Sequence, residues 1–183
     1  TLVEVGREFG TVTGRRRRAG WLDCVMLRQA IRLNSLTELA LTKLDVLDTF
    51  ETVKVCVAYQ ADGRRFDRFP DDQSLLHRAT AVYEELPGWS TDLTGITEPG
   101  DLPAAAADYI TFLEDQVGVP VRLVGVGPGR DQVLAQAADA GAQHRPGEGE
   151  VAGLLLPDDR VALIDPQQLL ELGRQPRFTG QGG

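Results

Sequence analysis

The chain has 183 residues, 42% of them hydrophobic and 25% charged, which is typical of a globular protein with one sizeable core. Its formal net charge of −8 argues against non-specific nucleic-acid binding, because affinity for a phosphate backbone comes mostly from Lys and Arg. The sequence has no apolar run near the roughly 20 residues of a membrane helix and no disulfide framework, so we expect a cytoplasmic protein without a membrane partner.

The first half of the sequence predicts a loop, a helix and two strands. Residues 6–20 are rich in Gly, Thr and Arg without apolar periodicity, which is typical of an ordered loop. Apolar residues recur at helical spacing over 21–33 and predict a helix. Residues 39–41 and the β-branched run 53–59 predict strands, and a polar insertion follows over 62–78.

The second half alternates between strand and helix signals. We expect residues 82–89 to be irregular and broken by proline, residues 101–118 to form a helix, and residues 121–126 to form a strand that runs into a glycine turn. This order predicts an α/β fold, with a mixed sheet, flanking helices and ligand-binding loops at the strand ends.

The C-terminal part differs in composition from the rest. Residues 1–139 form the main predicted domain, the Gly-rich stretch 140–150 is a predicted linker, and 151–183 form a small divergent tail. Within the tail we expect a hairpin that turns at Pro157 and Asp158, followed by a short helix.

The TKLD segment (residues 42–45) is the first candidate site, because it follows a predicted apolar strand. The Asp45 carboxylate could accept two hydrogen bonds from the N1 and N2 donors of guanine, while the Lys43 stem lies along the base. Adenine has no such donor pair. A solvated Lys and a turn-capping Asp are the ordinary alternative.

The glycine turn (residues 125–130, GVGPGR) is the second candidate. Its glycines would let backbone N–H groups approach a ligand closely and form the second wall of a guanine site. This hypothesis requires Asp45 to face a cavity shared with Gly127. A plain turn at the end of a strand is the alternative.

The arginine loop (residues 11–18, TVTGRRRR) is the third candidate. Two hydroxyls, a glycine and four guanidinium groups could hold a carboxylate or phosphate through paired hydrogen bonds. Nuclear targeting or RNA binding is the usual alternative for an arginine run. His77 and His144 are expected to be surface residues, and Cys24 and Cys56 buried structural thiols.

The segments EFGTVTGRRRRAGWLD, LTKLDVLD, VKVCVAY, YEELPGW and GVPVRLVGVGPGRDQ occur in an order that closely resembles the C-terminal third of adenylosuccinate synthetases, over about residues 6–132. The resemblance implies that GTP drives the ligation of IMP and L-aspartate, with magnesium, in purine nucleotide (AMP) biosynthesis. It also implies a cytoplasmic homodimer.

The resemblance assigns residues to ligands. It implies GTP contacts for Arg17, Lys43, Leu44, Asp45, Gly125, Val126 and Gly127, and an aspartate/IMP site at Thr11, Val12, Thr13, Gly14, Arg15, Arg16 and Arg17. Gly125 stands where many relatives carry Ser, so one side-chain hydrogen bond to the nucleotide would be missing.

The phosphate loop, the catalytic Asp and His, and the magnesium ligands of that family belong to its N-terminal part, which no segment here resembles. Because those segments are missing, we expect this chain alone to be inactive and to contribute no catalytic or metal-binding residue. The start at Thr1 in a patterned segment, without an initiator Met, indicates truncation, with processing as the alternative. The alternative is a non-catalytic relic that acts as an interaction module through its C-terminal tail.

Overall fold

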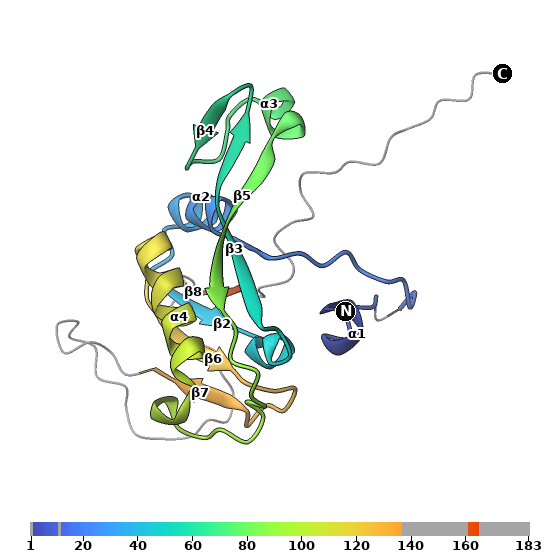
Figure 1. Cartoon of the computed structure of the whole chain (residues 1–183), viewed down its shortest axis with the longest axis vertical. Helices are drawn as coiled ribbons and strands as arrows, with labels where there is room; N and C mark the ends of the chain where they lie inside the picture. The colour runs from blue at the N-terminus through green and yellow to red at the C-terminus, as the bar shows by residue number, and fades with distance from the viewer. Residues whose placement is uncertain (1, 11, 137–160, 165–183) are drawn as a thin grey trace.

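Two small mixed sheets organise the chain (Figure 1). The computed structural model describes residues 2–10, 12–136 and 161–164. The first sheet is built around the long strand β3, and its members are β1 (Leu22–Asp23), β3 (Thr52–Ala61), β4 (Arg64–Phe66) and β5 (Thr80–Pro87). Strand β1 runs parallel to β3, whereas β4 and β5 are antiparallel to it.

The second sheet has the order β7-β6-β2-β8. Its strands are β2 (Glu38–Leu41), β6 (Val121–Gly125), β7 (Val133–Ala135) and β8 (Val161–Ile164). Strand β2 is central and parallel to both β6 and β8. The carboxyl ends of β2 and β6 therefore meet at the same edge of the sheet, where the TKLD segment and the glycine turn begin.

The helices lie around these sheets, and the two longest form part of a shared core (Figure 1). Helix α2 buries Leu27 and helix α4 buries Tyr109 and Leu113 against the strands. The helical segments are α1 (Leu2–Val5), α2 (Cys24–Asn34), η1 (Leu44–Leu47), α3 (Gln73–Arg78), η2 (Pro99–Asp101) and α4 (Ala104–Val117). No helix among the described residues is long and apolar enough to cross a membrane.

The structure confirms the mixed α/β fold and corrects two local predictions. Residues 82–89 were expected to be irregular, but most of them belong to β5, which pairs with β3 along nearly its whole length. Pro87 is tolerated because it ends an edge strand, where its missing N–H costs no sheet hydrogen bond. Pairing continues to Gly88, whose N–H donates to the Glu51 carbonyl (2.9 Å).

The predicted polar insertion 62–78 contains regular structure. Asp62 and Gly63 have φ angles of 51° and 73° and form the turn of the β3–β4 hairpin, for which Asp-Gly is a strong sequence signal. Helix α3 then follows with Asp72 as its N-cap. In the tail, β8 lies within the predicted hairpin and pairs with β2; the rest of that hairpin and the predicted linker lie outside the described residues.

A buried carboxylate joins the first sheet to α2. Asp23 caps the helix by accepting from the Val25 and Met26 N–H groups (2.9 and 3.0 Å), and its second oxygen accepts from the Tyr59 hydroxyl. Burial raises the pKa of Asp23 above its ordinary 3.8, while these donors lower it in part. Its contribution to the free energy of unfolding therefore falls as pH rises from 3.8 through the folded pKa.

We predict that Tyr59→Phe lowers the free energy of unfolding at pH 7 by about 1.5–3 kcal/mol, because the buried Asp23 carboxylate loses a donor. The pKa of Asp23 rises further in the variant, so the loss should shrink as the pH falls toward about 4. Urea unfolding at pH 7 and at about pH 4 measures this loss of unfolding free energy. Tyr83→Phe on β5 is the control, because it makes the same change at a half-exposed position. An equal effect of Tyr59→Phe at both pH values would contradict the role of Asp23.

Candidate functional site

The arginine loop is closed by a short antiparallel ladder. The Gly10 N–H donates to the Arg15 carbonyl and the Arg17 N–H donates to the Glu8 carbonyl, both at 2.8 Å. Gly14 has φ 61°, a left-handed conformation that suits glycine, and its N–H donates to the Gly10 carbonyl (2.7 Å). The described residues on either side of Thr11 are therefore joined by backbone hydrogen bonds, as expected for an ordered loop.

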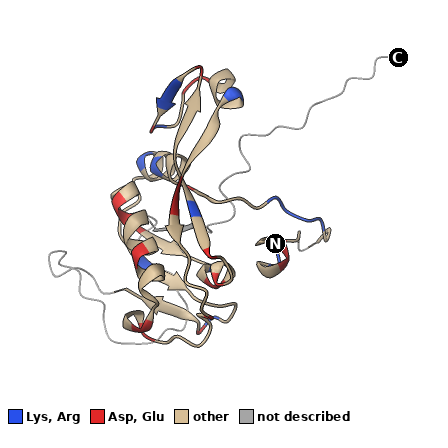
Figure 2. Ribbon diagram, viewed as in Figure 1, with Lys and Arg blue, Asp and Glu red and all other residues tan. Residues whose placement is uncertain are grey.

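The side chains of this loop lie in solvent. Val12 is 97% exposed, and Thr13 and Arg15 are exposed beside it. Arg16 pairs with Glu4 (3.0 Å) at the surface, and Thr11 lies outside the described residues. Figure 2 shows the Lys and Arg colour along this segment as well as on α2, α3 and β4. Residues 15–18 are all exposed, so the loop presents guanidinium groups that an anion could reach.

The TKLD segment forms the exit from β2 and the start of η1. Lys43 has φ 60°, which L side chains rarely adopt, and this sharp bend changes the direction of the chain. Leu44 is fully buried and anchors the bend in the core, whereas Asp45 is half-buried. The segment is therefore held at a fixed place, with one carboxylate oxygen of Asp45 (Oδ1) buried.

The glycine turn lies against the TKLD segment because β6 is the neighbour of β2. A Cβ on Gly125 would lie 3.4 Å from the Thr42 Cα and 3.5 Å from the Lys43 nitrogen, which is ordinary contact. The backbone of Gly125 thus adjoins the segment, as expected for the ends of neighbouring parallel strands.

Gly127 is placed differently. The position of a Cβ on Gly127 is filled by the Gln132 side chain, whose Cδ lies 2.5 Å from it. Gln132 is held there because it accepts from the Gly129 N–H (2.7 Å) and donates to the Thr94 carbonyl (2.8 Å). Val126 between the two glycines is fully buried.

Asp45 also lines an open hollow of about 400 Å³. The residues around it are Asp45, Asp48, Thr49, Ser90, Thr91 and Asp92. Gly127 does not line it, so this hollow is not the shared cavity that the guanine hypothesis requires. Asp48 is engaged in structure, since it accepts from the Trp89 ring N–H (2.7 Å) and the Leu93 N–H (2.9 Å). Burial raises the pKa of Asp48, and those two donors lower it in part.

Glu8 joins two candidate segments, and the sequence analysis did not single it out. Its carboxylate contacts the Lys43 ammonium through Oε1 and lies 3.6 Å from the Arg17 guanidinium through Oε2. The side chain is only 3% exposed. An acidic residue two positions before the glycine of an arginine-rich loop was the available signal, but its partner at Lys43 is visible only in the fold.

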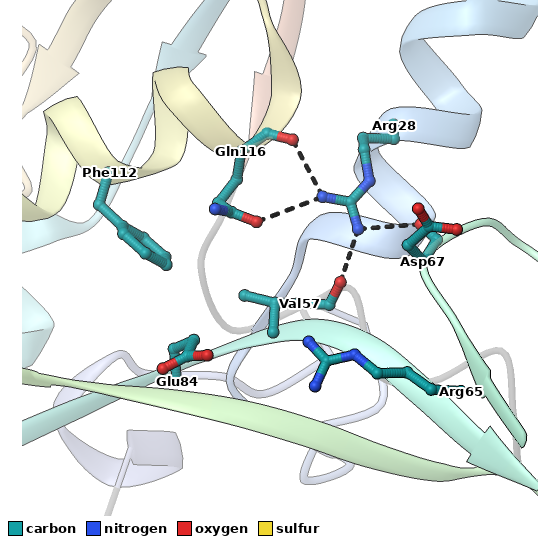
Figure 3. Close-up of a pocket in the computed structure, with 7 residues that line it drawn as sticks. All are labelled: Arg28, Val57, Arg65, Asp67, Glu84, Phe112 and Gln116. Atoms are coloured by element: carbon teal, nitrogen blue, oxygen red, sulfur yellow. Dashed lines mark hydrogen bonds between the residues drawn. The ribbon is translucent and has the colours of Figure 1, made fainter.

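A second hollow, of about 430 Å³, lies between α2, α4 and the first sheet (Figure 3). Arg28 crosses it and donates to the carbonyls of Gln116 (2.9 Å), Val57 (2.6 Å) and Asp67 (3.0 Å). Because its guanidinium bonds the backbone of α4, of β3 and of the loop after β4, Arg28 ties the two helices and the sheet together.

The remaining candidates have structural positions. His77 is exposed, and Cys24 and Cys56 are buried free thiols, as expected. His144 lies outside the described residues. Burial raises the pKa of both cysteines to about 12, which leaves them as thiols at neutral pH. Within the described part of the chain, no group of three His, Cys, Asp or Glu side chains could hold a metal ion.

The chain is similar to known proteins over the region that carries these segments. The family model of adenylosuccinate synthetase matches residues 1–134. Adenylosuccinate synthetases of Parafrankia sp. (strain EAN1pec) and Mycobacterium tuberculosis (strain CDC 1551 / Oshkosh) are 53% and 54% identical over 133 and 135 residues, which cover 73% and 74% of this chain.

A solved structure agrees with the sequence comparison. The fully ligated adenylosuccinate synthetase from Plasmodium falciparum matches with a TM-score of 0.71 and 35% identity, over 74% of this chain and 33% of that one. The chain spans 31% of the length of each of the two bacterial relatives. On the family match and these two comparisons, the chain belongs to the adenylosuccinate synthetase family.

Proposed function

We propose that this chain supplies the guanine-binding and aspartate/IMP-binding segments of a GTP-dependent ligase that joins IMP and L-aspartate into adenylosuccinate, in AMP biosynthesis. The observation that carries the proposal is the meeting of the candidate segments: Gly125 adjoins Lys43, and Glu8 contacts both Lys43 and Arg17. Residues more than 80 positions apart in sequence are thereby gathered at one edge of the second sheet.

At the guanine end, Asp45 would accept hydrogen bonds from the N1 and N2 donors of the base. Leu44 fixes the carboxylate by anchoring the bend in the core, and the backbone of Gly125 would form the opposite side. Lys43 would lay its stem along the base plane. The match of one carboxylate to two donors would give the preference for guanine over adenine.

At the arginine end, the exposed guanidinium groups would hold anions. The carboxylates of L-aspartate suit the paired donors of arginine, with Thr13 and the backbone around Gly14 completing the loop. Arg15 would also reach IMP and Arg17 would reach GTP. Val12 and Arg16 belong to the same proposed aspartate-binding loop, as does Thr11.

Magnesium would accompany GTP and neutralise charge on its phosphates. The described residues offer no cluster of three metal-binding side chains, so we assign no magnesium ligand to them. The proposal places the phosphate loop, the catalytic Asp and His, and the metal ligands in the parts of the family's length that this chain does not match. It includes a cytoplasmic homodimer.

We predict that Asp45→Asn removes the preference of this chain for GTP over ATP. The amide replaces one acceptor by a donor, which should cost about 1–3 kcal/mol, roughly a tenfold to hundredfold loss of GTP affinity. Titration of the full chain with each nucleotide, followed by NMR, measures both affinities.

Asp92→Asn is the matched control, because Asp92 lines the same hollow as Asp45 but is proposed to have no contact with guanine. It should leave both affinities unchanged. Equal binding of GTP and ATP by the unchanged chain would count decisively against the proposal.

We predict that Gly125→Ser strengthens GTP binding several-fold, because it would add a side-chain hydrogen bond beside the base, worth about 1 kcal/mol. The fold has room for the Cβ of a serine, since the nearest atoms to it would be 3.4–3.8 Å away. Gly127→Ser is the contrasting variant: its Cβ would displace Gln132 and lower the melting temperature. Weaker GTP binding by a normally folded Gly125→Ser variant would contradict the proposed wall.

A further inference from the structure

Glu8 is a buried carboxylate between two cations. Among the described residues, only Glu8 and Asp23 are charged side chains in the buried class. Asp23 has a structural role as a helix cap, but Glu8 contacts side chains of the two proposed binding segments. Removing a carboxylate from water is costly unless cations and hydrogen bonds compensate it, so this position needs both partners.

The backbone holds this carboxylate in a fixed place. The Glu8 N–H donates to the carbonyl of the buried Val3 (2.9 Å), and the Glu8 carbonyl accepts from the Arg17 N–H (2.8 Å). Helix α1 packs against η1, which follows Lys43. The backbone of Glu8 is therefore hydrogen-bonded to α1 on one side and to Arg17 of the arginine loop on the other. Its side chain extends to the TKLD segment.

The contact with Glu8 is made by the residue at the bend of the TKLD segment. Lys43 has φ 60°, a conformation that is disfavoured for a residue with a Cβ. Its ion pair with Glu8 therefore lies at this bend, two positions before Asp45. A change in the ion pairs of Glu8 should therefore alter the position of the Asp45 carboxylate, which would bind the base.

We propose that Glu8 is a positioning residue that couples the arginine loop to the guanine-recognition segment. This inference rests on the proposed function, because it assumes that Asp45 reads guanine and Arg17 reaches GTP. Glu8 itself would touch no substrate. One carboxylate is shared by two cations, so a phosphate that binds Arg17 weakens the Arg17–Glu8 ion pair and strengthens the Lys43–Glu8 ion pair. This coupling must be reciprocal.

The test is a double-mutant cycle on GTP affinity with the full chain. Glu8→Gln keeps the shape and removes the charge, while Lys43→Met keeps the aliphatic stem and removes the ammonium. We expect Glu8→Gln to weaken GTP binding roughly tenfold in the wild-type background and to have little further effect in the Lys43→Met background. A purely structural role would give the same loss in both backgrounds and would overturn the inference.

NMR of the Arg17 side-chain Nε–H measures the coupling directly. Lys43→Met should shift this signal in the wild-type background, because the carboxylate redistributes toward Arg17, and should not shift it when Glu8 is Gln. An unmoved signal in the wild-type background contradicts the coupling.

Glu4→Gln is the matched control, since Glu4 pairs with Arg16 at the surface and has a 54% exposed side chain. It should leave GTP affinity unchanged, as expected for an exposed ion pair. If Glu8→Gln does not fold, Glu8→Asp replaces it: the shorter acid keeps the charge but cannot span both cations, and wild-type GTP affinity in that variant overturns the inference.

The outcomes separate the two proposals. Equal affinity of the wild-type chain for GTP and ATP overturns the proposed function and the role of Glu8 with it. A wild-type preference for GTP, together with a GTP affinity that Glu8→Gln leaves unchanged, overturns only the role of Glu8.

Discussion

The parallel pairing of β2 with β6 is the constraint on which the rest of the arrangement depends. Parallel strands end at the same edge of a sheet, so the TKLD segment and the glycine turn must emerge side by side although they are far apart in sequence. The buried Leu44 and Val126 then anchor the two exits in the core. Sheet topology, which serves stability, thereby also determines which polar groups can act together.

Local sequence signals predicted the elements that form from their own residues. Helix α2 and strand β3 follow from apolar periodicity and β-branching, and the buried cysteines follow from their apolar neighbours. Strand β5 was not predicted, because Pro87 and Gly88 indicate an irregular segment when only neighbouring residues are considered. Pairing with β3 makes this segment a strand. The Asp62-Gly63 pair is a sequence signal for a hairpin turn, but no turn was predicted there.

The candidate site could likewise be predicted only in part from the sequence. The segments could be identified from their residue types and order, but their mutual contacts could not. Nothing in the sequence places Glu8 against Lys43, because that contact depends on helix α1 packing beside η1. Nor does the spacing of glycines reveal that Gln132 fills the space beside Gly127. Side-chain contacts between loops depend on tertiary packing, which periodicity does not encode.

The charge distribution of the chain constrains where an anion could bind. A chain with a formal charge of −8 repels nucleotides and dicarboxylates at long range, so any site for them needs a local excess of cations. The exposed arginine loop supplies this excess (Figure 2), and the buried Glu8 limits it by engaging Arg17 and Lys43. A site arranged in this way would hold its cations in defined positions before an anion arrives, which reduces the ordering cost of binding.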